Sequence, residues 1–532
     1  MTKRFSYLGV ASACSLLAAC GGTPSPSDTG FTGADGGNSS GSGGSTGGAP
    51  SSGGGSGGSN PPSASGGSSG GSSGSSGSGG SSGSGSNGGS SSGGGGSDGG
   101  ASGSSSGGSG SSSGGGCGAG DPVLAAANVS EPSLPSSVCK TIQATKIVAA
   151  GGAPNGTADT SAIQTALDAC SGKAVKLVAN GANNALLTGP LTINGAVLWI
   201  DAGVTLYAAK GSSGNIITVT GTGSGIVGDG TIDGQGSSYW SNPPGPALIQ
   251  ASGSKFVMYK IHLHNSPGFH VKITGDHFVI WGTTLQTPST NSGQTPATAH
   301  NTDGIDPGAG AHSATSYGYI VCNTISVGDD MIAIKGGTNG PVSNLVIAHN
   351  HFGAGHGMSI GSETGPGGVS NVSVYDLTVD GNVFPGESAV NANGIRIKSY
   401  QGAGGLVDHV SYRDICTRNL ANPILLEPNY TAGSVTGGGT PQFTNITIKD
   451  FHDLSTSSVR PHVTLDGYDA SHSSSVTLDN VVVDGSPTVT SSNATVTFGP
   501  GGANFSVPGA TRSGTPNPID CSNRWVTFPV TF

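Results

Sequence analysis

The stretch from Asn301 to Tyr430 decides the fold of this chain, because short apolar runs alternate in it with small groups of charged residues. The polar groups are the segments Asn301-Thr302-Asp303, Val327-Gly328-Asp329-Asp330, Gly355-His356-Gly357, Arg396-Ile397-Lys398 and Asn422–Tyr430. The first three lie about 26 residues apart, and a period of this length is typical of a solenoid. If each period forms one coil, these polar groups stack on a single face.

A weak internal repeat extends this pattern in both directions. Each copy holds a polar corner, two or three alternating apolar residues and a further polar residue; the copies begin at Ser254, Gly275, Ser316, Ser343, Ser370, Val407, Phe443 and Ser474. One such unit cannot bury its apolar face alone, whereas stacked units form a continuous core. Because no helical pattern lies between the copies, the sequence predicts an all-β fold, and a parallel β-helix fits better than a sandwich or a βαβ fold.

A single amphipathic helix is expected before the strands. Asp159 or Thr160 can cap it, and one face carries four apolar residues at helical spacing, namely Ile163, Ala166, Leu167 and Cys170. We expect this short helix to cover the N-terminal end of the solenoid and so to protect an open strand edge.

The first 120 residues have a different character. Lys3 and Arg4 precede an apolar run that is too short to span a membrane, as in a signal peptide. The tetrapeptide ending at Cys20 (Leu-Ala-Ala-Cys) resembles a bacterial lipobox, which implies cleavage before Cys20 and lipidation of its thiol. The following hundred residues are almost wholly Gly and Ser and cannot bury enough apolar surface to fold.

Three regions are therefore expected: a lipoprotein signal peptide (1–19), a lipidated Cys20 with a flexible tether (20–120), and a folded domain (121–532). The protein would be exported and held by its lipid at the outer membrane or cell surface. The alternative is an ordinary signal cut near Ala19, followed by secretion.

Export would place the remaining cysteines in an oxidising compartment. Six remain after Cys14 and Cys20, and six allow 15 pairings; they are Cys117, Cys139, Cys170, Cys322, Cys416 and Cys521. We favour a bond between Cys139 and Cys170, because these two flank the first folded segment.

The charge balance excludes several classes of partner. A formal net charge of −10 argues against nucleic acid binding, and no basic patch with interleaved aromatic residues is present. No CxxC motif occurs, and we expect neither a metal nor a cofactor. An acidic protein can still bind a polyanion where cations line a cleft.

Successive side chains of a strand point to opposite faces, and this parity gives a first test of where the charged side chains lie. If Ile395 and Ile397 point inward, Arg396 and Lys398 point outward together and form an anion clamp on an exposed face. The same parity would bury Asp330, which is costly for an unpaired carboxylate. We therefore expect the strand to be broken at Gly328–Asp330, which leaves both carboxylates in the cleft.

Carboxylates gathered with a histidine on a long open face indicate acetal hydrolysis. One carboxylic acid protonates the leaving oxygen, while another carboxylate activates water or attacks carbon. Crowding of like charges raises the pKa of one carboxyl group and so supplies the acid.

The motifs resemble those of polygalacturonases, glycoside hydrolase family 28. The resemblance is carried by NTDGIDP from Asn301, GDD from Gly328, GHGMSIGSE from Gly355, GIRIKS from Gly394 and NPI…Y from Asn422. It extends over roughly Ser130 to His452 and is similar to bacterial endopolygalacturonases. It implies a right-handed parallel β-helix that hydrolyses α-1,4-galacturonan of pectin with inversion at the anomeric carbon.

The resemblance also implies roles for individual residues. Asp329 would be the general acid, Asp303 and Asp330 would activate the water, and His356 would help set the protonation of the acid. In the same way, Arg396 and Lys398 would hold a substrate carboxylate, Tyr430 would contact the sugar, and Asn301 would support the constellation.

Two loops depart from the family pattern. Asn291–His300 and Asn382–Asn393 are longer than the resemblance leads one to expect, and such loops set substrate length. We expect endo action by a monomer, with exo action or another pectic backbone (rhamnogalacturonan or xylogalacturonan) as the alternative. A Ca²⁺-dependent pectate lyase and a non-enzymatic polysaccharide-binding surface protein are the remaining rivals.

Overall fold

The computed structural model describes residues 117–240, 245–289, 294–309, 314–336, 340–381, 393–430, 439–454 and 460–528. All of them belong to one compact unit, Ser112–Phe532. The expected signal peptide, Cys20, most of the expected tether and parts of both loops that depart from the family pattern (291–293 and 382–392) lie outside the described residues. None of the helices in the described ranges is both long and apolar enough to cross a membrane.

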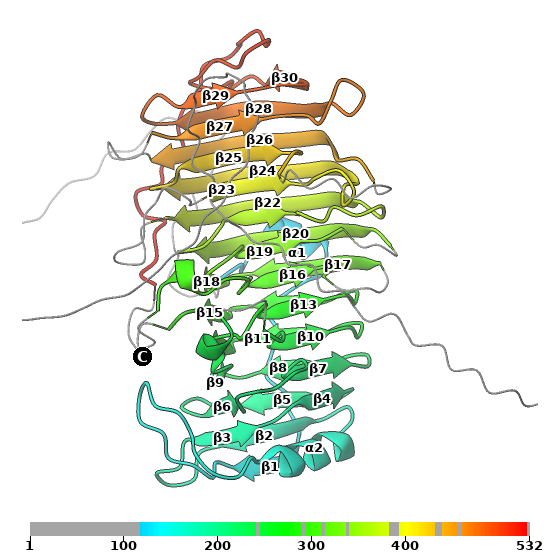
Figure 1. Ribbon diagram of the computed structural model, residues 1–532, viewed down its shortest axis with the longest axis vertical. Coiled ribbons are helices and arrows are strands. Elements are labelled where there is room, and N and C mark those ends of the chain that lie inside the picture. Colours follow the sequence, from blue (N-terminus) through cyan, green and yellow to red (C-terminus); the bar gives the residue numbers. More distant parts are fainter. Residues whose placement is uncertain are drawn as a thin grey trace, which may run out of the picture. The chain divides into compact units, whose positions relative to one another are not determined.

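Short parallel strands make up nearly all of the regular structure, and they stack coil upon coil along one axis from β1 to β30 (Figure 1). One sheet, the site sheet, takes one strand from each of eleven coils. Its strands are β4 (Leu191–Asn194), β7 (Ile217–Thr220), β10 (Ile249–Ala251), β13 (Val271–Ile273), β16 (Ile305–Pro307), β19 (Ile332–Ile334), β21 (Met358–Ile360), β23 (Asn393–Lys398), β25 (Asn422–Glu427), β27 (His462–Leu465) and β29 (Thr488–Thr490).

The other strands form a second, continuously bonded sheet that wraps the remaining sides of the coils. They are β1 (Val138–Gln143), β2 (Ala174–Val178), β3 (Ala185–Thr188), β5 (Val197–Ile200), β6 (Thr205–Ala208), β8 (Gly225–Val227), β9 (Thr231–Asp233), β11 (Val257–Tyr259), β12 (His262–His264), β14 (Val279–Trp281), β15 (Thr284–Gln286), β17 (Thr315–Val321), β18 (Thr324–Ser326), β20 (Val342–Phe352), β22 (Val369–Asp380), β24 (Leu406–Arg418), β26 (Gln442–Leu454), β28 (Ser474–Val483) and β30 (Ala494–Phe498).

The internal repeat corresponds to the second sheet and is in register throughout. Equivalent apolar residues of the eight copies pair directly with one another, in the order Met258, Ile280, Ile320, Ile347, Val374, Tyr412, Ile448 and Leu478. All eight are buried. Burying one apolar side chain of this size contributes about 1.5–3 kcal/mol, so the repeated column is a large part of what holds the coils together. The predicted parallel β-helix is confirmed.

The predicted helix is α2 (Thr160–Ala169), which lies at the β1 end of the stack (Figure 1). Ile163, Ala166 and Leu167 are buried as expected. Asp159 occupies the N-cap position, but its side chain makes no capping hydrogen bond. Its carboxylate instead accepts hydrogen bonds from Lys146 Nζ at 3.0 Å and from the Leu187 amide at 2.9 Å, and so joins the helix start to β3.

Three disulfides close the unit. The expected bond between Cys139 and Cys170 is confirmed and fixes the end of α2 to β1. Cys117 is joined to Cys322, which lies between β17 and β18, across 205 residues of chain. Cys416 of β24 is joined to Cys521, and this bond holds the C-terminal segment, which runs back along the stack from β30 (Figure 1).

A charged cluster, here called the latch, joins both ends of the described folded unit to the second sheet. His349 of β20 lies between the carboxylates of Asp121 and Asp376, with its Nε2 3.0 Å from Asp121 Oδ2. Asp121 also accepts hydrogen bonds from two amides of the short helix α1 (Pro122–Ala126), which it caps. On the C-terminal side, Arg524 pairs with Asp376 and, at 2.7 Å, with Asp414.

Two further short elements are 3₁₀ turns. They are η1 (Gly236–Ser238) and η2 (Pro296–Thr298), and η2 lies just before the site sheet strand β16. The last copy of the repeat, which begins at Ser474, forms β28 as expected.

Candidate active site

The charged segments converge because they occupy equivalent places on neighbouring coils. The site sheet pairs Ile305 with Ile332, and Ile332 with Met358. Asp303, Asp330 and His356 each lie two residues before one of these paired residues, so they stack on three successive coils roughly 4.8 Å apart. The predicted convergence of residues far apart in sequence is therefore found in the structure.

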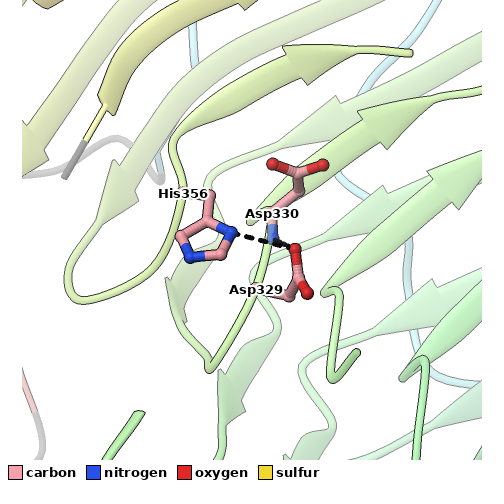
Figure 2. Close-up of side chains that lie close together, drawn as sticks. All are labelled: Asp329, Asp330 and His356. Carbon is pink, nitrogen blue, oxygen red and sulfur yellow. Dashed lines mark hydrogen bonds and ion pairs between the residues drawn. The ribbon is translucent and has the colours of Figure 1, made fainter. Parts of the chain in front are cut away.

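Asp329 and His356 form a directly bonded pair. The distance from His356 Nδ1 to Asp329 Oδ1 is 3.0 Å, as Figure 2 shows. Asp329 also accepts hydrogen bonds from the Asp330 amide at 2.9 Å and the Asn301 amide at 3.2 Å. Asn301 thus supports the Asp329–His356 pair through its main-chain amide, and its backbone has a positive φ of 55°.

Burial by itself would raise the pKa of Asp329. The opposing charge of His356, its hydrogen bond and the charge of Lys398 outweigh burial, and they hold that pKa below its usual range. Burial conversely lowers the pKa of His356, but the charge and hydrogen bond of Asp329 raise it overall. In the unliganded protein one proton is thus shared by the pair and resides mainly on the imidazole.

Asp330 points away from this pair (Figure 2). Its Oδ1 accepts a hydrogen bond from Ser359 Oγ at 2.7 Å, and Lys398 Nζ lies 3.1 Å from its Oδ2. The side chains of Asp330 and Lys398 are only 1% and 4% exposed, so little solvent screens the contact.

Asp303 is in a different electrostatic setting. It is 3% exposed, and burial together with the negative charges of Asp329 and Asp306 raises its pKa well above the usual value. The positive charge of Lys335, whose Nζ lies 3.9 Å from Asp303 Oδ2, opposes this rise in pKa. His270 fixes the backbone beneath it, since both its amide and its Nδ1 contact the Asp303 carbonyl oxygen.

The clamp predicted from parity is present, but it is not exposed. Arg396 and Lys398 are 8% and 3% exposed, because the Tyr430 ring covers them at 4.9 Å and 4.8 Å, respectively. Cation–π contacts of this kind hold both side chains in place. Arg396 also lies 3.8 Å from Glu427 of β25. The expectation of an exposed cationic face was wrong, since it considered the sheet without the segment around Tyr430.

The expected strand break is confirmed. β19 begins at Ile332, and Gly328 to Asp330 form a bend before it. No side chain could replace the hydrogen of Gly328, because a Cβ there would lie 2.2 Å from the Ala299 carbonyl oxygen. This close approach of two coils is what delivers both carboxylates to the same place.

Four contributors to the site were not named from the sequence: Asp306, Lys335, Ser359 and Glu427. Asp306 is fully buried, neither of its carboxylate oxygens has a hydrogen-bond partner in the described part of the chain, and burial raises its pKa to about 8. A sequence signal existed for Lys335, because Ile332–Lys335 and Ile395–Lys398 share the pattern Ile-x-Ile-Lys.

The cluster of Asp329, Asp330 and His356 could in principle hold a metal, because one ligand atom from each lies within 4.8 Å of the others. The described side chains do not fit such an ion well. Lys398 lies 3.1 Å from Asp330, and the His356 Nδ1 is bonded to Asp329. Positive charge is therefore already supplied to both carboxylates by the protein.

A cleft of about 490 Å³ lies toward the N-terminal end of the same edge of the solenoid. It is lined in part by Tyr207, Asp233 and His264, which pair in register at the ends of β6, β9 and β12. The same column continues through Gln286 to Ser326, which immediately precedes the Gly328–Asp330 bend. The cleft therefore lies on the same edge of the solenoid as the charged cluster, on the coils nearer the N-terminal end.

Comparisons with known proteins agree with this geometry. A family profile described as "Glycosyl hydrolases family 28" matches residues 160–500. The chain is 39% identical over 511 residues to a polygalacturonase of Ralstonia nicotianae, covering 77% of this chain and 94% of that protein. It is 38% identical over 411 residues to an endo-polygalacturonase of Pectobacterium carotovorum, covering 69% of this chain and 92% of that protein.

Among solved structures, the polygalacturonase from Erwinia carotovora matches with a TM-score of 0.56 and 36% sequence identity, over 69% of this chain and 98% of that one. The family match spans more than half of the chain and includes every charged segment described above. This protein therefore belongs to glycosyl hydrolase family 28.

Proposed function

We propose that this protein hydrolyses α-1,4-galacturonosyl linkages of polygalacturonate, the de-esterified backbone of pectin. The observation that carries the proposal is the position of the Arg396–Lys398 clamp directly beside the cluster of Asp303, Asp329, Asp330 and His356. Carboxylates with a histidine suit acetal hydrolysis, and the clamp selects an acidic sugar over a neutral one.

In this proposal Asp329 delivers the proton to the leaving glycosidic oxygen. The proton comes from the Asp329–His356 pair, since His356 holds it 3.0 Å from the carboxylate. Asp330, whose Oδ2 lies 3.1 Å from Lys398 Nζ, is the principal base that takes a proton from the attacking water, and Asp303 contacts the same water. The water oxygen bonds to the anomeric carbon, and the cleaved chain gains one new reducing end.

Inversion at the anomeric carbon is proposed from the family resemblance. The approach of Asp329 to Asp330, within 4.8 Å between their ligand atoms, is shorter than the roughly 6.5–9.5 Å usual for inverting pairs. The stereochemistry is therefore a sharp test, and proton NMR of the first-formed product decides it. A product with retained anomeric configuration would refute inversion.

Endo action is supported by the cleft nearer the N-terminal end of the solenoid, which could hold more sugar units, and by the similarity to an endo-polygalacturonase. Exo action is the second candidate, because the two loops that depart from the family pattern directly precede the charged segments at Asn301 and Gly394 in the sequence. Viscosity and reducing ends measured together separate the two. Early loss of viscosity with mixed oligomers means endo action, and release of short products at nearly constant viscosity means exo action.

The experiment that tests the function uses the full chain, because a start at Asp121 would remove Cys117 and its bond to Cys322. Polygalacturonate is incubated with wild type, Asp329→Asn and the control Asp201→Asn, whose side chain is 41% exposed and far from the cluster in sequence. Reducing ends without ultraviolet absorbance, lost only in Asp329→Asn, support hydrolysis. An absorbing product that disappears in EDTA would mean a lyase, and no turnover would favour a binding protein.

We also propose that the protein is exported and anchored through a lipid on Cys20. Three disulfides in one unit support an oxidising compartment. The test is labelling of cells with a radioactive fatty acid, followed by fractionation. Wild type should be labelled and sediment with membranes, whereas Cys20→Ser should be unlabelled. Label-free wild type in the medium would refute the anchor.

A further inference from the structure

Two strands of the site sheet carry the same four-residue pattern. Ile332–Lys335 and Ile395–Lys398 both read Ile-x-Ile-Lys, and they lie two coils apart. The strand register places Lys335, Gly361 and Lys398 in one column on three successive coils. The two ammonium-bearing side chains therefore start from equivalent positions on the outer face, roughly 10 Å apart along the stack.

The two lysines also have equivalent partners. Lys398 Nζ lies 3.1 Å from Asp330 Oδ2, and Lys335 Nζ lies 3.9 Å from Asp303 Oδ2. Asp303 and Asp330 themselves occupy the same place on neighbouring coils. Lys335, which follows β19, reaches back one coil to Asp303, whereas Lys398 at the end of β23 reaches back two coils to Asp330. Both lysines therefore face the column of aspartates from one row of the site sheet.

Lys335 differs from Lys398 in how tightly it is held. Its second carboxylate neighbour, Glu363, is 3.5 Å away, and both of its contacts are longer than the contact between Lys398 and Asp330. The negative charges of Glu363 and Asp303 outweigh burial and raise the pKa of Lys335, so its ammonium persists. Its side chain is 15% exposed, against 4% for Lys398.

The position between the two lysines has no side chain. Gly361 has a φ of +104°, and a Cβ there would lie 1.8 Å from the Lys398 carbonyl oxygen. A larger residue is therefore excluded at this place. Gly361 thus allows close approach of the β21 and β23 coils, and no side chain of its own stands between the two lysine positions.

We propose that Lys335 is a second carboxylate-binding cation of the cleft, and that it holds the galacturonate unit across the scissile bond from the unit held by Arg396 and Lys398. This inference rests on the proposed function. A ligand carboxylate can approach the Lys335 ammonium without breaking a short ion pair, since its present contacts are 3.5 Å and 3.9 Å long. Both sugar units at the cleavage point must then carry free carboxylates.

The rival explanation is that Lys335 only compensates the buried charges of Asp303 and Asp306. Loss of a purely compensating charge would impair every substrate by the same factor. Loss of a substrate contact would instead abolish the preference for a free over an esterified carboxylate at one sugar unit. The same preference at the other sugar unit would be unchanged. Discrimination between esterified and free units is therefore the decisive measurement.

The experiment uses the full chain and three oligogalacturonates: the free oligomer and two isomers, each with one methyl ester on one of the two units flanking the cleaved bond. For wild type we expect kcat/KM to fall at least about tenfold with either ester, because each ester removes one charge-assisted contact. Lys335→Met should be slower on the free oligomer and insensitive to the ester on one unit only. Lys398→Met should be less sensitive to the ester on the other unit, which Arg396 still contacts.

The matched control is Lys176→Met on β2, whose side chain is 22% exposed and pairs with Asp201 at 3.1 Å. It should behave as wild type on all three oligomers. An equal loss on all three in Lys335→Met would overturn the inference, as would reduced sensitivity of both lysine variants to the same isomer. Thermal unfolding of each variant excludes a folding defect.

Calorimetry separates this inference from the proposed function. The free oligomer is titrated into Asp329→Asn and into Asp329→Asn combined with Lys335→Met. We expect weaker binding in the double variant and a smaller dependence on salt. Unchanged affinity would refute the role of Lys335. If wild type released no reducing ends from polygalacturonate, the proposed function would fail, and the titration would still decide whether Lys335 binds a carboxylate.

Discussion

Two clusters in this protein are built from the same residue types, a histidine between carboxylates with a basic side chain close by, yet they differ in how completely their charges are paired. In the latch, His349 contacts the carboxylates of Asp121 and Asp376, and Arg524 contacts those of Asp376 and Asp414. In the site, Asp303 Oδ1, both oxygens of Asp306 and Arg396 Nε are buried without a hydrogen-bond partner among the described residues.

This difference in charge pairing indicates that the latch serves stability and the site serves activity. A buried polar group without a partner costs about 1–3 kcal/mol, so a site that keeps several of them is less stable than it could be. Such a cost is retained where a ligand supplies the missing partner. The latch has no comparable open position among its described residues, and it joins α1 and the C-terminal segment to β20, β22 and β24. Changes to the site should therefore alter activity, and changes to the latch should alter stability.

The largest effect is expected for Asp329→Asn. Loss of the general acid should lower kcat on polygalacturonate by about 10²–10⁴-fold, while the melting temperature stays close to that of wild type. Galacturonosyl fluoride sharpens the test, because fluoride leaves without protonation. Asp329→Asn should retain most activity on the fluoride, and Asp330→Asn should not. Equal losses on both substrates would contradict the assignment of the acid.

Removal of the Cys416–Cys521 bond should have the largest effect on stability. The bond closes a loop of 105 residues, so its loss in the double Cys→Ser variant should lower the free energy of unfolding by about 2–5 kcal/mol. Denaturant unfolding measures the loss, and kcat on polygalacturonate should change less than twofold. The double Cys→Ser variant of Cys139 and Cys170 is the comparison, because its loop spans only 31 residues.

His356→Gln should shift the pH dependence of activity. The pKa of His356 is raised by Asp329 and Asp330 against the effect of burial, so the proton of the pair is lost only above the usual imidazole range. Without the imidazole the proton rests on Asp329 alone, and the alkaline limb of kcat/KM should move to lower pH. The profile of His409→Gln, whose imidazole is exposed on the second sheet, should match wild type. An unmoved alkaline limb in His356→Gln would show that another group carries the proton.

The smallest effect concerns the pH window of stability set by the latch. Burial lowers the pKa of His349, but Asp376 and Asp121 raise it above 6.5 overall, so its contribution is complete below that pH and is lost as pH rises through the folded-state value. Burial raises the pKa of Asp376, yet His349 and Arg524 bring it down to about 2, so its contribution is complete above its ordinary value of 3.8 and is lost as pH falls toward 2.

The latch should therefore stabilise the fold most between about pH 4 and 6.5. Melting temperatures measured across pH should show a maximum in this window for wild type and a flatter curve for His349→Gln. His409→Gln is again the control. A curve of unchanged shape in His349→Gln would mean that the latch contributes nothing that depends on protonation.

The sequence predicted those features that depend on the coil repeat. Asp303, Asp330 and His356 were expected to converge because their spacing matches the period, and the register of Ile305, Ile332 and Met358 delivers them to one place. The bond between Cys139 and Cys170 was expected because the two cysteines flank the first folded segment. Local pattern was sufficient in each of these examples.

Features that depend on returning segments were not predictable in this way. The bond between Cys416 and Cys521 and the contacts of Arg524 arise because the C-terminal segment runs back along the stack, and no periodicity encodes that path. The burial of Arg396 has the same origin, since the segment around Tyr430 covers it from outside the sheet. Parity fixes the side of a strand on which a residue lies, but it does not reveal what covers that side.

The bond between Cys117 and Cys322 has a mechanical consequence. Any pull on the chain N-terminal to Cys117 is carried by the sulfur–sulfur bond to the residue between β17 and β18. Force therefore enters the solenoid at a middle coil, where a β-ladder holds it on both sides, rather than at β1, where a terminal strand could be peeled away. The covalent bond protects the N-terminal coils from shear and leaves α2 outside the path of the load.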